Sequence, residues 1–197
     1  FKRGYFPDSC PPSSHVTLKF PKTNKTKGDV IVHWMDGGIQ PERPAELQAN
    51  ETFGDGGNGT LFVGTKGKMM SNTYSADPRL LPLSKNADIK VKEKYTRVKD
   101  EANGHYAQWV EAAIAGYGKQ ELSSPFEIAG PLTEALLMAN LAIRGADVQR
   151  KTADGKITYP GRYAKLLWDN NAMKVTNFDE VNQFVKREYR KGWTLGS

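Results

Sequence analysis

The chain has 197 residues, of which 38% are hydrophobic and 25% charged, a composition typical of a folded globular protein. This composition excludes a disordered chain, a collagen-like repeat and a coiled coil. No apolar run approaches the roughly 20 residues that a membrane helix needs, so we expect no bilayer-spanning segment and no membrane partner. The single cysteine, Cys10, cannot form an internal disulfide, so hydrophobic packing must hold the fold together.

The net charge of +6 invites a nucleic-acid interpretation, which the distribution of the charges does not favour. The densest basic stretches are residues 90–99 and 186–191, and neither interleaves with stacking aromatic residues. No helix-turn-helix or zinc-ligand spacing occurs, so we expect no nucleic-acid partner. The chain begins with Phe1 rather than Met, and we expect it to be a piece of a longer protein.

The first half of the chain predicts strands joined by turns. Alternating apolar residues favour strands over 15–20 and 29–35, the second of which breaks at Asp36-Gly37-Gly38. Residues 61–64 and 68–74 flank Thr65-Lys66-Gly67, a composition typical of a tight hairpin. A further short strand is expected over 88–94.

The second half predicts helices, because its apolar residues recur every three or four positions. The first helix contains Tyr106 and Trp109 and ends at Gly116. Pro131 is expected in the first turn of a second helix that reaches Gly145, and its low charge predicts that it is largely buried. A third helix is expected after Asn177, which would be its N-cap.

Strands followed by helices predict an α+β fold with an open, mainly antiparallel sheet and helices packed on one face. No internal repeat or linker divides the sequence. We therefore expect a single domain over residues 1–197, with residues 1–14 as an extended lead-in.

Residues 54–59 (GDGGNG) match the G-x-G-x-x-G pattern of dinucleotide-binding proteins. That mechanism needs a strand before the glycines and a helix after them, so that the helix N-terminus holds the pyrophosphate. Here a polar loop precedes the motif and a strand-like segment follows it. The sequence therefore predicts a flexible loop and no cofactor-binding site in this chain.

Few side chains stand out as chemical groups. Asp29 and His33 would share a face of a helix, but their β-branched neighbours favour a strand, on which the two lie about 13 Å apart and form no dyad. His105 is the best-placed functional imidazole, although a structural histidine is the more common case. Cys10 has no basic partner near it in the sequence and is assigned no nucleophilic role. No tight cluster of His and carboxylate residues predicts a metal site.

The aromatic residues leave two interpretations open. Trp34, followed by Asp36, places a flat ring and a carboxylate where a strand opens into a loop, an arrangement that suits a sugar as well as it suits a core tryptophan. Trp168 and Trp193 are expected to be packing anchors around the last helix.

Six segments give the chain a family resemblance. From about residue 15 to Trp193 it resembles the bacterial-type C-terminal domain of the Gfo/Idh/MocA oxidoreductase family. The resemblance is carried by residues 33–38 (HWMDGG) with Pro41 and Pro44, by 59–68 (GTLFVGTKGK), by 105–110 (HYAQWV), by 130–144 (GPLTE to NLAIR), by 168–177 (WD to MKVTN) and by 189–193 (YRKGW).

The resemblance implies a parent enzyme with an N-terminal Rossmann domain that binds NAD or NADP and a C-terminal domain that binds substrate and mediates assembly. The usual reaction is hydride transfer at a carbinol of a sugar, cyclitol or related polyol, and some relatives cleave glycosidic bonds through transient oxidation. The family's catalytic Glu-Lys-Pro motif is absent from this chain, and its one Asp-x-x-x-His, Asp29 to His33, falls on a predicted strand. No catalytic role is therefore carried over, and we expect this chain alone to be inactive.

We expect Trp34, Asp36, His105 and Tyr106 to lie near a sugar-like small molecule. No residue is assigned to catalysis, to a cofactor or to a metal; the expected partners are the protein's own Rossmann domain and a second copy, in a homodimer or a larger oligomer. The alternative is a stand-alone carbohydrate-binding or oligomerisation module without redox activity. For a bacterial protein of this kind, either a cytoplasmic or a periplasmic location is compatible with the sequence.

Overall fold

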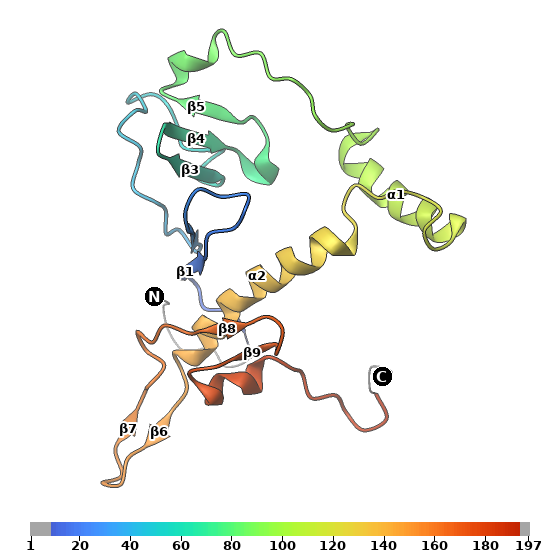
Figure 1. Ribbon diagram of the computed structural model, residues 1–197. Helices are drawn as coiled ribbons and strands as arrows, with labels where there is room; N and C mark the ends of the chain where they lie inside the picture. The colour runs from blue at the N-terminus through green and yellow to red at the C-terminus, as the bar shows by residue number, and fades with distance from the viewer. Residues whose placement is uncertain (1–8, 194–197) are drawn as a thin grey trace. The chain divides into compact units, whose positions relative to one another are not determined.

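The computed structural model describes residues 9–193, without the side chains of residues 101 and 102. Within this range the chain divides into two compact units (Figure 1). Unit 1 combines the segment up to Ile39 with the segment from Gly118 onward, and unit 2 is the continuous stretch Gln40–Tyr117. Each unit is described here by itself. The single domain expected from the sequence stays a prediction, because two such units can belong to one cooperatively folding domain.

Unit 1 begins with an antiparallel hairpin of β1 (His15–Phe20) and β2 (Val30–Met35). Val16 pairs with Trp34 and Phe20 with Val30, so the even-numbered residues of both strands share one face. On this apolar face Val16 is buried, while Val30, Val32 and Trp34 stay 39–49% exposed. Both predicted strands are confirmed to within one residue.

The longest element of unit 1 is α2 (Phe126–Gly145), which contacts β1 and the short helix η3 (Asp179–Phe184). Two further hairpins pair β6 (Arg150–Lys151) with β7 (Ile157–Thr158) and β8 (Trp168–Asp169) with β9 (Lys174–Val175). The core of the unit lies where the end of α2 meets η3 and consists of five residues: Leu141, Val148, Val175, Phe178 and Val181.

Helix α2 differs from its sequence prediction in two ways. It begins at Phe126, and Pro131 therefore lies inside it rather than in its first turn, where the missing N–H leaves the Glu127 carbonyl without its helical donor. It is also mostly exposed: in the described chain only Leu141 and Gly145 of this helix are buried. The expectation of burial was wrong because apolar composition indicates that a helix needs a partner surface, not that the same chain supplies it.

By length and composition α2 is the one helix in the described residues that meets the requirements for crossing a membrane. The sequence estimate missed it because Glu134 and Arg144 interrupt the apolar run. Core helices of water-soluble proteins pass the same test. The expectation that the chain has no membrane partner thus stays a prediction.

The last predicted helix is shorter than expected. The 3-10 helix η3 begins at Asp179, and Asn177 does not cap it. Instead the Asn177 amide accepts a hydrogen bond from the Leu167 backbone N–H (2.8 Å) and donates one to the Lys165 carbonyl (2.7 Å). Asn177 thereby fixes the segment that leads into β8, which is a loop-bridging role that its sequence position did not reveal.

Unit 2 contains the antiparallel sheet β3 (Thr60–Gly64), β4 (Gly67–Ser71) and β5 (Arg79–Leu81), with the short helices η1 (Thr73–Ser75) and η2 (Leu83–Asn86) beside it. The tight hairpin predicted around residues 65–67 is confirmed. Leu47, Met70 and Leu81 form the buried core of unit 2.

Helix α1 (Glu101–Ala115) ends at Gly116 as predicted. The strand expected over 88–94 is wrong: these residues form an exposed loop without a strand partner in the described chain.

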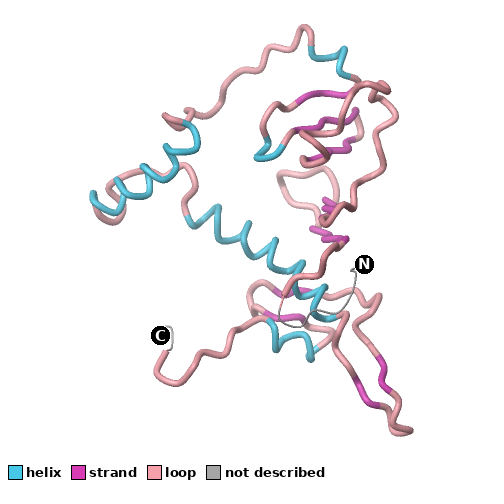
Figure 2. Tube along the Cα trace, turned by 180° about the vertical axis from the view of Figure 1, so that it is seen from behind, coloured by secondary structure: helices cyan, strands magenta, loops and turns pink. Residues whose placement is uncertain are grey.

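The α+β class is confirmed, with helices and antiparallel strands in the same chain. The strands do not form the one open sheet that was expected, however. In the described residues they make four separate sheets of two or three strands, and long loops connect them (Figure 2). Loops rich in Gly and Pro, such as residues 36–44 and 54–59, separate the hairpins and explain why the strands do not continue into one another.

Candidate functional site

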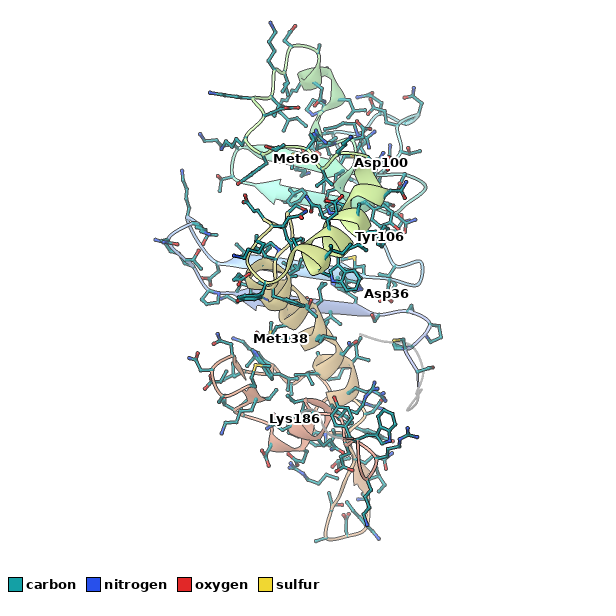
Figure 3. The ribbon with its side chains drawn as sticks, turned by 90° about the vertical axis from the view of Figure 1, so that its right-hand side faces the viewer. Asp36, Met69, Asp100, Tyr106, Met138 and Lys186 are labelled. Carbon is teal, nitrogen blue, oxygen red and sulfur yellow. The ribbon has the colours of Figure 1, made fainter. Side chains whose placement is uncertain are left out.

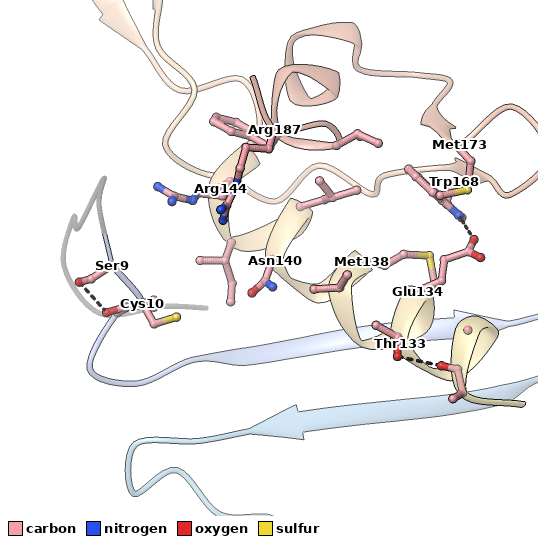
Figure 4. A pocket seen from close by; sticks show the side chains of 18 of the residues that line it. Ser9, Cys10, Thr133, Glu134, Met138, Asn140, Arg144, Trp168, Met173 and Arg187 are labelled. Atoms are coloured by element: carbon pink, nitrogen blue, oxygen red, sulfur yellow. Dashed lines mark hydrogen bonds between the residues drawn. The ribbon is translucent and has the colours of Figure 1, made fainter. Parts of the chain in front are cut away.

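A groove in unit 1 follows one side of α2 and is the candidate site of this unit (Figure 4). Its volume is about 810 Å³, within the usual range for sites that bind small molecules. Three parts of the chain line it: residues 9–11, helix α2, and the stretch from β8 to the residues after η3. Most of its wall is apolar, so its few polar groups decide what it can recognise.

At one end of the groove, Trp168 and Glu134 are joined by a hydrogen bond. The indole N–H of Trp168 donates to Oε1 of Glu134 at 2.7 Å, and both side chains are partly buried (Figure 4). Oε2 of Glu134 accepts no hydrogen bond from the described residues, so it remains able to accept one from a ligand hydroxyl. A flat ring beside a carboxylate of fixed orientation is a combination that suits a polyhydroxylated ring.

Local structure holds Trp168 in this position. Trp168 pairs with Val175 across the β8–β9 hairpin, and the backbone N–H of Thr176 donates to the Leu167 carbonyl at 2.8 Å. The side-chain oxygen of Asn177 accepts a hydrogen bond from the backbone N–H of Leu167. Glu134 lies near the middle of α2, where the helical backbone fixes its direction. Because both residues come from ordered backbone, their bond is built into the fold.

The other end of the groove is cationic. Arg144 and Arg187 both line it, and Figure 4 shows their guanidinium groups at the end remote from Trp168. The guanidinium carbon of Arg144 lies 5.9 Å from the centre of the Phe184 ring, a cation–π distance. The groove therefore offers hydrogen-bond acceptance at one end and positive charge at the other.

The predicted site residues Trp34 and Asp36 are in contact at the end of β2. Asp36 is labelled in Figure 3. Asp36 Oδ1 accepts a bond from the Ser14 backbone N–H (2.6 Å). Its Oδ2 accepts bonds from the Ser14 hydroxyl (2.8 Å) and from the Trp34 indole N–H (3.1 Å). Both carboxylate oxygens thus tie the strand end to the preceding segment. Contact of this pair with a ligand stays a prediction, and Asp36 has an evident structural task.

The other two predicted residues, His105 and Tyr106, are consecutive on α1 in unit 2. Both side chains are exposed, and Tyr106 is labelled in Figure 3. Adjacent helical residues diverge by about 100°, so the two do not face one point of the helix surface. The structure therefore brings Trp34 and Asp36 together and leaves His105 and Tyr106 on a separate unit, where their ligand contact stays a prediction.

Asp29 and His33 form no dyad: Asp29 forms an ion pair with Lys19 (2.8 Å), and the hydrogen bond from Lys19 is the main cause that lowers the pKa of this carboxyl. The glycine-rich loop 54–59 leads into β3 with no helix after it, as expected. In residues 9–193, no three His, Cys, Asp or Glu side chains lie close enough together to hold a metal ion.

Sequence reasoning missed the Trp168–Glu134 pair. Trp168 was expected to be a packing anchor, and Glu134 served only as a part of the family resemblance. The two are 34 positions apart, and their contact depends on how β8 meets α2, which no periodicity encodes. A carboxylate in an otherwise apolar helix was the one available signal, because such a group needs a partner when it is partly buried.

No family model matches this chain, and no curated protein matches it.

Proposed function

We propose that this chain is the substrate-binding and assembly domain of an NAD(P)-dependent oxidoreductase of the Gfo/Idh/MocA type that acts on a sugar, cyclitol or related polyol. The dehydrogenase C-terminal-domain fold is part of the proposal. The six sequence segments that resemble the family support it, and they include residues 130–144 and 168–177, which supply Glu134 and Trp168. The observation that carries the proposal is the groove in which these two residues meet.

A polyol fits the chemistry of this groove. Sugar hydroxyls donate hydrogen bonds to a carboxylate, and the C–H face of a pyranose or cyclitol packs on an aromatic ring. The Trp168 indole already orients one oxygen of Glu134, so the carboxylate loses little freedom when a ligand arrives. The proposal assigns hydride transfer to no residue of this chain. The proposal therefore assigns the nicotinamide cofactor and the catalytic lysine to a Rossmann domain of the parent protein.

Exposed apolar surface supports the assembly role. Ile128, Leu132 and Leu136 on α2, which lie outside the groove, are 48–59% exposed, and Val32 and Trp34 on the hairpin are 39–49% exposed. Soluble monomers rarely leave that many large apolar residues uncovered along single elements. We propose that the Rossmann domain and a second copy of the protein cover them, in a homodimer or a larger oligomer. Light scattering at micromolar concentration tests this, and a monomeric full-length protein would contradict it.

Polyol binding is tested by titrating myo-inositol, D-glucose and D-glucitol into the full chain while tryptophan fluorescence and protein NMR spectra are recorded. Glu134→Gln should weaken the binding of a responsive polyol about tenfold, because one charge-assisted hydrogen bond is lost. Trp168→Ala should weaken it at least as much. The control is Glu121→Gln, an exposed carboxylate of the same unit outside the groove, which should leave the affinity unchanged. Equal affinity in all four proteins would contradict the proposed site.

The alternative function is a stand-alone carbohydrate-binding or oligomerisation module without redox activity. The groove suits it equally well, since binding a polyol requires no cofactor. Two tests distinguish the oxidoreductase domain from the stand-alone module: the coding sequence ahead of residue 1, and a reduction assay with the parent protein. Polyol-dependent formation of NADH or NADPH supports the oxidoreductase. Polyol binding without formation of NADH or NADPH, and without a Rossmann fingerprint in the gene, supports the module. Glycoside cleavage that depends on NAD would identify the parent as an NAD-dependent glycosidase.

A further inference from the structure

Two of the three histidines of the chain meet on the polar face of the β1–β2 hairpin. Nε2 of His15 lies 3.2 Å from Nδ1 of His33, and the hydroxyl of Thr17 lies 3.0 Å from the same Nδ1. The ring centres are 5.4 Å apart and the rings are tilted by 59°. One nitrogen from each ring thus points toward the same place in space.

The separation of the two nitrogens suits a shared metal ion as well as it suits a hydrogen bond. Imidazole nitrogens bind zinc at about 2.0–2.1 Å, and at a tetrahedral angle two such nitrogens lie roughly 3.3–3.4 Å apart. The 3.2 Å seen here differs from that separation by about 0.1–0.2 Å. A small rotation of either ring about its side-chain torsions would open room for the ion, with no change in the strand register.

The register brings a third ligand type to the same face. Met35 pairs directly with His15 across the hairpin and lies two residues after His33 on β2, so all three occupy one face. Thioether sulfur is a soft ligand that favours copper(I), whereas imidazole accepts zinc and copper alike. The hairpin therefore places His15, His33 and Met35, two imidazoles and one thioether, on one face.

We propose that His15 and His33 form a two-imidazole chelate for a late transition-metal ion, and that Met35 is the third protein ligand when that ion is copper(I).

The proposed ion would act as a clamp on the hairpin. A two-stranded hairpin is marginally stable alone, and its apolar face is only partly covered. A metal that binds both strands stabilises the paired state in proportion to the logarithm of its free concentration. The clamp would also fix the end of β2 from which Trp34 and Asp36 project. This inference does not depend on the function proposed for the groove.

The test uses the full chain with Cys10→Ser in every sample, since an exposed thiol would bind the same metals. Zinc chloride, and copper(I) under anaerobic reducing conditions, are titrated by calorimetry while the imidazole NMR signals are followed. We expect one ion per chain, shifts in the signals of both His15 and His33, and a rise in the melting temperature.

The variants His15→Gln and His33→Gln should each weaken binding at least tenfold, and far-UV circular dichroism checks that both remain folded. His105→Gln is the matched control and should stay within twofold of the parent affinity. Met35→Leu should weaken copper(I) binding but not zinc binding. Unshifted His15 and His33 signals up to millimolar metal, or equal binding in His33→Gln, would overturn the chelate. Unchanged copper(I) affinity in Met35→Leu would overturn the role of the thioether.

Discussion

A single methyl group added at either of two glycines of unit 1 should have very different effects on stability. Gly161 is buried against the end of α2, and a Cβ placed there would lie 2.0 Å from the Gly145 carbonyl oxygen and 2.7 Å from Cε1 of Phe178. Gly130 lies within α2, and a Cβ there would meet nothing within 4 Å. Neither glycine has a positive φ. Gly130 precedes Pro131, however, whose ring disfavours a helical residue with a Cβ at the position before it.

The magnitudes follow from these contacts. At Gly161 the obstacle is a backbone oxygen, which cannot turn away as a side chain can, so the loop and α2 must separate by more than 1 Å. Overpacking of this kind costs about 3 kcal/mol, the upper end of the usual range. At Gly130 the change to alanine removes the helix penalty of glycine, about 1 kcal/mol, but the new Cβ meets the ring of Pro131, which opposes this gain, so the stability should change little. The two variants should therefore differ by roughly 3 kcal/mol.

Urea unfolding measures the difference. Far-UV circular dichroism follows α2, and tryptophan fluorescence reports on Trp168 beside it. Gly161→Ala should lower the unfolding midpoint and Gly130→Ala should leave it nearly unchanged, with unchanged slopes in both. If Gly161→Ala stayed within about 0.5 kcal/mol of the parent protein, the close approach between Gly161 and α2 would be wrong. A loss of stability in Gly130→Ala as large as that in Gly161→Ala would contradict the open space around Gly130.

Three further results are expected. Met70→Ala should destabilise unit 2 by about 2–5 kcal/mol in urea unfolding, because Met70 is completely buried; a neutral effect would refute its core position. The Thr73 hydroxyl is the main cause that lowers the pKa of Asp55, so stability from this carboxyl is present above pH 3.8 and is lost as the pH falls through the lowered pKa. Thr73→Val should move the Asp55 pKa back toward 3.8 in carboxyl-carbon NMR titrations, and an unmoved titration would exclude the bond. Gly37→Ala should lower the melting temperature sharply, because Gly37 has φ +62° and its Cβ would lie 1.9 Å from the Pro12 carbonyl oxygen.

Local patterns predicted the elements well and the assembly of those elements poorly. The strand 15–20 and the hairpin around 65–67 follow from alternation and turn residues, which are properties of neighbours in sequence. The exposure of α2 could not be predicted in this way, because burial depends on a partner surface. Pro131 misled in a similar way: tolerance of proline at a first turn does not prevent a helix from starting five residues earlier.

In the candidate site, too, contacts between sequence neighbours were predictable and contacts between distant elements were not. Trp34 and Asp36 are two residues apart at the end of β2, and their proximity was predictable from the sequence. Glu134 and Trp168 belong to a helix and to a hairpin that meet only in the folded unit, so their bond was not predictable. The Asp36 carboxylate illustrates a further limit. A sequence shows that a carboxylate is present but not that Ser14 already occupies both of its oxygens.

The division of unit 1 into two chain segments has a consequence for its synthesis. The hairpin β1–β2 leaves the ribosome before the whole of unit 2, and α2, which contacts β1, follows only after it. At ordinary translation rates this interval lasts roughly 5–15 s. During that time Val16 and its apolar neighbours have no helix to pack against, while unit 2 is continuous and can complete its own core. The apolar face of the nascent hairpin is therefore a surface that a chaperone can protect during this interval.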